Sequence, residues 1–224
     1  MPAIPTMPAM PAMPDPAPPP AFADAAAAWD RRFAAEGFLF GTEPNAWLRE
    51  HAGVWRPGQR VLSVADGEGR NSVWLAQQGL QVQAFDISPV GVAKARAFAA
   101  RAGVAVDYAL ADIDGWPWPQ AAFDGIAAIF VQFADPPRRQ RLFARMVAAL
   151  APGGTLLLQG YTPRQLEYRT GGPPHLDHLY TGDLLREAFA GLEIAELREY
   201  EADLAEGSGH HGRSALIGLV AHRR

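Results

Sequence analysis

A Gly-x-Gly turn between two apolar runs, followed by an aspartate, carries the clearest chemical signal in this sequence. Gly67-Glu68-Gly69 follows the run Val61-Leu62-Ser63-Val64 after two intervening residues, and Asp86 ends the run that starts at Val82. Glycines at such a turn let the backbone approach a ligand closely. An acidic side chain at the end of the next strand can accept hydrogen bonds from ribose hydroxyls. The order and spacing therefore predict a βαβ unit with a nucleotide-type cofactor site.

The residues after the turn discriminate between cofactors. A dinucleotide fingerprint has a third glycine three residues after the second, and Ser72 occupies that position here. A phosphate-binding loop of the Walker type needs Gly-Lys-Ser/Thr, and Arg70-Asn71-Ser72 follows instead. A nicotinamide-dependent reductase is therefore the weaker alternative. A turn that only joins a strand to a helix is the alternative without function, and the spacing of Asp86 favours a functional site over it.

Apolar patterns along the rest of the chain alternate between strand and helix. We expect strands over 61–65, 82–85, 104–110, 125–130 and 155–160. One helix between them ends at residue 78, and two others span 90–101 and 137–150. Helices over 23–35 and 46–51 precede them, and a helix over 181–189 and strands over 194–201 and 214–221 follow. This alternation predicts a Rossmann-like, doubly wound α/β fold with a mostly parallel seven-stranded sheet and a terminal antiparallel strand pair. Ligands of such sheets bind beyond the carboxyl ends of the strands.

Further motifs follow the glycine turn in a defined order. They are Asp86-Ile87-Ser88, Ala111-Asp112-Ile113, Phe123-Asp124-Gly125-Ile126 and Leu150-Ala151-Pro152-Gly153-Gly154. With Gly69-Arg70-Asn71-Ser72 they resemble class I S-adenosylmethionine-dependent methyltransferases, and they are similar to the small bacterial enzymes related to the tellurite-resistance and thiopurine methyltransferases. Residues 29–33 and 38–45 resemble the N-terminal segment of that group, which lies near the cofactor.

The resemblance implies roles for individual residues. Asp86 would hold the ribose hydroxyls of S-adenosylmethionine, Asp112 would accept from the adenine amino group, and Ile113 would pack near the ring. The candidate cofactor-binding residues are Ala65, Asp66, Gly67, Gly69, Arg70, Asn71, Asp86, Ile87, Asp112, Ile113 and Phe130.

One position departs from the pattern of the group. The first strand of these enzymes ends in an acidic residue followed by Gly-Cys-Gly, whereas Ser63 occupies the acidic position here and Asp66 the cysteine position. Asp66 either supplies the missing negative charge to the cofactor or only orders the turn through its own hydrogen bonds. The sequence leaves both readings open.

Candidate catalytic residues are Tyr161 and His210. A sulfonium is an excellent leaving group, so alignment of donor and nucleophile supplies much of the catalysis, and a base is needed mainly for a hydroxyl or a protonated amine. Tyr161 follows the fifth strand. His210 precedes the last strand and could lie over the same ligand site at the carboxyl ends of the strands. Because Gly207 and Gly209 mark a turn, a solvated loop is the alternative reading for His210.

Composition limits the acceptor and the compartment. The formal charge is −4 without any basic run, which argues against nucleic acid and favours a small-molecule substrate. Cysteine is absent, so methyl transfer must be direct, and a cytoplasmic location fits. No apolar run is long enough for a membrane helix, so no membrane partner is expected. His175 and His178 lack a third ligand, so no metal site is predicted. Oligomeric state is not indicated.

The expected organisation is a Pro-rich disordered tail over 1–22 and a single methyltransferase domain over 23–224. The expected function is S-adenosylmethionine-dependent methyl transfer to a small acceptor by direct in-line displacement. The resemblance points to a thiol or other chalcogen compound. A non-catalytic S-adenosylmethionine-binding sensor or regulatory subunit is the alternative from another class, and Ser63 in the acidic position adds weight to it.

Overall fold

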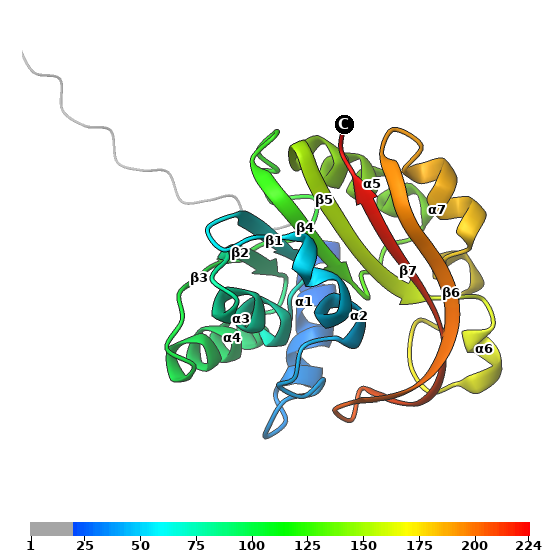
Figure 1. Ribbon diagram of the computed structural model, residues 1–224. Coiled ribbons are helices and arrows are strands. Elements are labelled where there is room, and N and C mark those ends of the chain that lie inside the picture. The colour runs from blue at the N-terminus through cyan, green and yellow to red at the C-terminus, as the bar shows by residue number, and fades with distance from the viewer. Residues whose placement is uncertain (1–19) are drawn as a thin grey trace, which may run out of the picture.

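The computed structural model describes residues 20–224 and is built around one seven-stranded sheet (Figure 1). The strand order is β3-β2-β1-β4-β5-β7-β6. The strands are β1 (Arg60–Val64), β2 (Gln81–Asp86), β3 (Val106–Leu110), β4 (Phe123–Ile129), β5 (Leu150–Tyr161), β6 (Glu193–Glu206) and β7 (His210–His222). The predicted Rossmann-like sheet with a terminal antiparallel pair is confirmed. The tail proposed for residues 1–22 falls mostly outside the described residues.

Strands β1 to β5 are parallel, and helices cover both faces of the sheet. Helices α3 (Arg70–Gln77) and α4 (Pro89–Arg101) join β1 to β2 to β3, whereas α5 (Pro136–Ala149) joins β4 to β5. Right-handed crossovers that run in opposite directions along a sheet place their helices on opposite faces. From β1 the chain adds β2 and β3 on one side of the sheet, and from β4 it adds β5 on the other side. The connections that leave the carboxyl ends of the neighbouring strands β1 and β4 therefore run in opposite directions. Such a switch point is where ligands bind in open α/β sheets.

The terminal hairpin is longer than the sequence predicts. The strands expected over 194–201 and 214–221 extend to Glu206 and start at His210, and β7 pairs antiparallel with both β5 and β6. The turn falls at Gly207, as its glycine signal indicates, with φ +64°. The strand ends next to the turn are polar and show no strand pattern in the sequence. An edge strand faces water, so its residues need not alternate in hydrophobicity. The extension carries His210 into the sheet.

Helix α2 (Ala46–His51) packs against the sheet, where Trp47 lies over Gly218 of β7, whereas helix α1 (Pro20–Phe33) packs on α4. Asn45 caps α2 by accepting a hydrogen bond from the Leu48 amide at 3.1 Å. The predicted helix over 46–51 is confirmed. Short helices Gln165–Tyr168 (α6) and Gly182–Ala188 (α7) and single 3₁₀ turns over 52–54 and 176–178 complete the described chain. No helix in residues 20–224 is long and apolar enough to cross a membrane.

Residues 34–45, which we call the strap, lie between α1 and α2 and are fastened to the glycine turn. The Lys94 ammonium donates to the carbonyls of Ala35 and Gly37, both at 2.8 Å, and to the Glu68 carboxylate at 2.9 Å. Glu68 in turn accepts from the Leu39 amide at 2.7 Å. Because Glu68 is buried, this ion pair is shielded from solvent more than a surface pair would be. The strap is therefore held over the carboxyl end of β1.

Candidate active site

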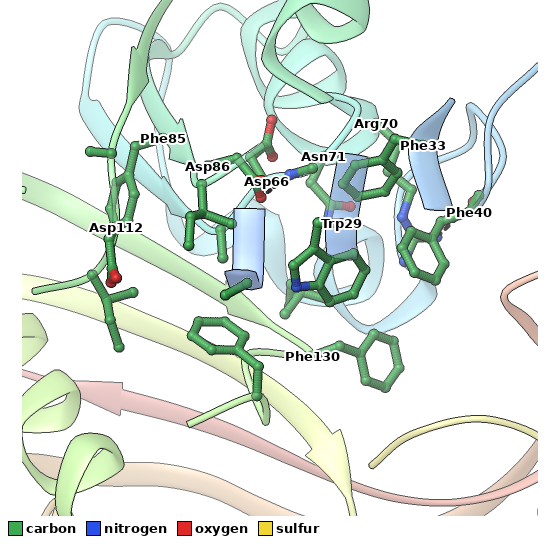
Figure 2. Close-up of a pocket in the computed structure, with 18 of the residues that line it drawn as sticks. Trp29, Phe33, Phe40, Asp66, Arg70, Asn71, Phe85, Asp86, Asp112 and Phe130 are labelled. Atoms are coloured by element: carbon green, nitrogen blue, oxygen red, sulfur yellow. Dashed lines mark hydrogen bonds between the residues drawn. The ribbon is translucent and has the colours of Figure 1, made fainter. Parts of the chain in front are cut away.

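One pocket opens at the carboxyl ends of β1, β2 and β4, under α1 and the strap (Figure 2). The sequence-predicted cofactor residues that line it are Ala65, Asp66, Gly67, Arg70, Asn71, Asp86, Ile87, Asp112, Ile113 and Phe130. His210 lines it as well. Residues from five separate parts of the chain thus meet in one place, as expected of a site built on strand ends.

Asp86 ends β2 and faces the glycine turn across the pocket floor. Its carboxylate accepts hydrogen bonds from the Gly67 amide at 2.8 Å and from the Ser88 amide at 2.9 Å. Burial, together with the smaller effect of the neighbouring Asp66, raises the pKa of Asp86 to about 6 against the opposing effect of these two donors. The side chain therefore both orders the turn and presents a carboxylate with unused lone pairs to the pocket.

Cofactor affinity should fall in mild acid because of this carboxylate. The predicted role of Asp86 is to accept from ribose hydroxyls in its ionised form, and protonation below pH 6 weakens it as an acceptor because one oxygen then carries a hydrogen. We expect the affinity for S-adenosylhomocysteine to be constant above pH 7 and to fall about tenfold by pH 5. Calorimetric titration across this range measures it. Asp86→Asn should bind weakly with a flat profile, and an unchanged slope in that variant would assign the dependence to another group.

Asp66 orders the glycine turn and is itself held by two serines. Its carboxylate accepts from the Ser63 hydroxyl at 2.7 Å, from the Ser72 amide at 3.2 Å and from the Ser72 hydroxyl. Burial raises the pKa of Asp66, although these hydrogen bonds oppose the shift. Asp66 thus orders the turn through its hydrogen bonds, and Ser63 is one of its two serine donors. Since Asp66 also lines the pocket, its predicted charge contact with the cofactor stays a prediction.

Gly69 does not line the pocket, and its part in the site is conformational. It adopts φ +92° at the start of α3. A Cβ atom at this position would lie 2.8 Å from the Cβ of Ala95 and 2.9 Å from the hydroxyl of Tyr108. The turn can therefore pack against α4 and β3 only with glycine at this point.

The end of the pocket beyond β2 and β3 has a charged rim and an aromatic floor. Asp112 is paired with Arg138 and accepts from the Asp114 amide at 3.0 Å. Phe85 lines the pocket and stacks on Trp116 at a ring distance of 4.9 Å. Trp116 and the neighbouring Trp118 are buried and pack against each other edge to face. Phe85 was not among the predicted contacts, since its apolar pattern predicts only a buried strand.

The opposite end of the pocket is walled by aromatic rings from distant segments, seen in Figure 2 around Trp29. We call the set Trp29, Phe33, Phe40, Phe130 and His210 the aromatic chamber. Trp29 and Phe33 stack at 5.3 Å, and Phe40 and Phe130 each lie 4.4 Å from the His210 ring. Phe130 follows β4 with φ +57°, a conformation that is rare for a bulky residue and marks functional sites. The predicted proximity of residues 29–33 and 38–45 to the pocket is observed for these rings.

The two catalytic candidates occupy different positions. His210 is buried in β7 at the pocket wall, so the reading of a solvated loop is wrong; strand pairing with Glu206 continues to the turn. Tyr161 does not line the pocket. Its ring stacks on Phe130 at 4.7 Å, and its hydroxyl has no hydrogen-bond partner within the described part of the chain. Tyr161 therefore supports the chamber from behind.

Comparison with known proteins agrees with this geometry. Residues 61–154 match the family described as methyltransferase domain. The uncharacterized protein Rv1403c of Mycobacterium tuberculosis is 30% identical over 156 residues, which cover 69% of this chain and 48% of that protein. Demethylmenaquinone methyltransferase of Thermus thermophilus is 33% identical over 109 residues, 47% of this chain and 48% of that enzyme. The chain spans about half the length of these curated relatives.

A solved structure shows the same fold. The N-methyltransferase NodS of Bradyrhizobium japonicum, in complex with S-adenosylhomocysteine, superposes with a TM-score of 0.67 at 16% identity, over 88% of this chain and 97% of NodS. A parallel sheet with a pocket at its switch point, floored by Asp86 and the glycine turn, defines a Rossmann-like cofactor-binding domain. Residues 61–154 thus form a methyltransferase domain, and the fold and motifs around it agree with the class I S-adenosylmethionine-dependent type that the sequence predicts.

Proposed function

We propose that this chain binds S-adenosylmethionine in the pocket and transfers its methyl group to a small acceptor, a thiol or another chalcogen compound. The observation that carries the proposal is the convergence of the family motifs on one pocket that is continuous with the aromatic chamber. Asp86 at the floor offers acceptors for ribose hydroxyls, and Asp112 and Ile113 line the end where an adenine would lie.

The chamber suits the reacting end of this cofactor. Bound there, S-adenosylmethionine supplies a methyl group on a positively charged sulfur. Aromatic faces attract such cations, and Trp29, Phe40 and Phe130 present rings to the same space. Walls of this kind also exclude water and hold two reactants in line, which can lower the barrier by roughly 7–11 kcal/mol. These residues therefore have the means to position donor and acceptor.

A small acceptor fits the enclosure better than a macromolecule. Helix α1, the strap and the β6–β7 hairpin meet over the chamber, where the Gly209 amide donates to the Leu39 carbonyl at 2.9 Å. A nucleic acid would need a basic groove, whereas the formal charge of the chain is −4. We therefore propose a small-molecule partner and direct transfer without a metal.

The Asp66 contacts bear on the sensor alternative. The sensor alternative was supported by Ser63, which occupies the usual acidic position. In the structure the Ser63 hydroxyl donates a hydrogen bond to Asp66. The pair places a carboxyl group in the turn itself, so an acidic side chain remains at the pocket. Turnover is what separates the two functions: an enzyme converts S-adenosylmethionine to S-adenosylhomocysteine with an acceptor, and a sensor only binds it.

Calorimetric titration with S-adenosylmethionine, S-adenosylhomocysteine and NADPH side by side tests the proposal. We expect saturable binding of both sulfur compounds and none of NADPH. Product analysis with a labelled methyl donor and a panel of thiols, chalcogen anions and small amines then identifies the acceptor class. Binding of NADPH alone would support the reductase instead, and binding of S-adenosylmethionine without transfer to any acceptor would support the sensor.

A further inference from the structure

Arg70, Glu206 and His210 form a buried, hydrogen-bonded group at the wall of the aromatic chamber, and the sequence did not indicate that these side chains meet. Arg70 of α3 donates to Glu206 of β6 at 2.7 Å, and His210 of β7 places Nδ1 3.3 Å from the same carboxylate oxygen. The other oxygen of Glu206 accepts from the Asn45 amide group at 2.9 Å. The side chains of Arg70, Glu206 and His210 are each no more than 10% exposed. Partners from α3, from β7 and from the strap thus fix the position of the Glu206 carboxylate on β6.

The hydrogen bonds define which nitrogen of His210 is free. Burial opposes ionisation of Glu206, but the hydrogen bond from His210 and the charge of Arg70 outweigh it and hold the pKa of Glu206 at about 2. An ionised carboxylate only accepts, so Nδ1 of His210 carries the hydrogen. Nε2 then keeps its lone pair and has no hydrogen-bond partner among residues 20–224. The ring borders the pocket, so this nitrogen is the one available to a ligand.

The surroundings of His210 keep the imidazole neutral. Burial lowers the pKa of His210, and the cations Arg70 and Arg32 lower it as well, while Glu206 raises it. The remaining ionisable group packed on the ring is Tyr161, whose own pKa is raised by burial, so its hydroxyl stays protonated and uncharged. Neutral imidazole is the form that can accept a proton.

The charge of the pocket disfavours an anionic acceptor. Two cationic side chains, Arg70 and Arg138, line it within the described part of the chain, and both are paired. Arg70 is bound to Glu206, and Arg138 to Asp112 and Asp114. The side chains that line the pocket therefore offer an anionic acceptor no uncommitted positive charge, and Arg32, which lies outside this lining, stacks on the Trp29 ring at 4.3 Å. A neutral acceptor does not need such a charge.

We propose that Glu206 is a positioning residue that fixes His210 as a neutral base, and that the acceptor is a small thiol bound in its protonated form. This proposal rests on the function proposed above. The thiol loses its proton to Nε2 of His210 as its sulfur bonds to the methyl carbon. The bond between that carbon and the cofactor's sulfur breaks, and its electron pair stays on that sulfur, giving a thioether and a neutral second product.

Proton NMR titration of the histidine rings tests the positioning role without any cofactor. His210→Gln assigns the signal, and Glu206→Gln should move its midpoint to lower pH by about one unit or more, because the partner that raises it is lost and Arg70 becomes unpaired. Asp203→Asn removes an exposed carboxylate from the same strand and should leave it unmoved. An unchanged His210 midpoint in Glu206→Gln would overturn the role of Glu206.

Methyl-transfer assays with two thiols test the base and the acceptor class. For 2-mercaptoethanol, which is protonated at neutral pH, His210→Gln should lower kcat, measured at saturating S-adenosylmethionine, by roughly 10²- to 10⁴-fold. For 4-nitrobenzenethiol, which is ionised, the loss should be less than tenfold. An equal loss of kcat for both thiols, or no loss for 2-mercaptoethanol, would contradict the role of His210 as the base. Cofactor binding without methylation of either thiol would overturn the acceptor class, whereas failure to bind the cofactor would refute the proposed function itself.

Discussion

Replacement of Asp86 by alanine should weaken binding of S-adenosylhomocysteine by roughly 100-fold or more. Hydrogen bonds to a charged group contribute about 1.5–3 kcal/mol each, so loss of two ribose contacts exceeds the energy of a hundredfold change in affinity. Calorimetric titration of wild type and variant at pH 7.5 measures the change. An affinity within twofold of wild type would remove Asp86 from the cofactor site.

A stability measurement must accompany that experiment. The Asp86 carboxylate also accepts from the buried amides of Gly67 and Ser88, so the variant should lose about 1–3 kcal/mol of unfolding free energy for each donor left without a partner. Asp107→Ala is the matched control, because Asp107 lies exposed on the neighbouring strand β3 and pairs with Gln83. It should bind the cofactor as wild type does.

Gly69→Ala should destabilise the fold by about 2–5 kcal/mol. The added methyl group would overlap Ala95 of α4, which is backbone-anchored and cannot move aside; overpacking of this kind costs about 1–3 kcal/mol. The φ of +92° adds a further 1–2 kcal/mol, roughly, for a residue with a Cβ atom. Urea unfolding followed by circular dichroism gives the difference in unfolding free energy.

Gly103→Ala separates the two contributions. Gly103 also has a positive φ, +68°, but a Cβ atom there would meet nothing within 4 Å. Its substitution should therefore show only the smaller conformational cost. Equal destabilisation at both positions would mean that the contact of Gly69 with Ala95 relaxes freely and that the turn is not tightly packed.

The parallel half of the fold could be read from the sequence because local patterns encode it. β1, expected over 61–65, spans Arg60–Val64, and α4, expected over 90–101, spans Pro89–Arg101. These strands are buried on both faces and appear as apolar runs, and glycines mark the turns. The long hairpin was underestimated because β6 is an edge strand, where burial imposes less pattern on the sequence.

The cofactor half of the site was predictable for a similar reason, since motifs at strand ends must meet at one edge of a parallel sheet. The acceptor half was predicted only in part: the resemblance placed residues 29–33 and 38–45 near the cofactor and His210 was a candidate, but the aromatic chamber as a whole and Glu206 were not predicted. Trp29 and Phe40 reach the chamber from a helix and a strap that precede the sheet, and Glu206 and His210 reach it across a hairpin turn. Contacts between such distant segments depend on how the ends of the fold pack, so no spacing in the sequence reports them.

The side chain that holds the strap is also the one lysine of the sequence that an amine-directed reagent can label. Lys94 is the single lysine of the sequence, and its nitrogen is held by Ala35, Gly37 and Glu68. An amine-directed reagent therefore has one side chain to modify, and it must compete with the strap for that nitrogen. Acylation at this position and a seated strap exclude each other. The rate of labelling at one residue thus reports how often the cover of the pocket lifts.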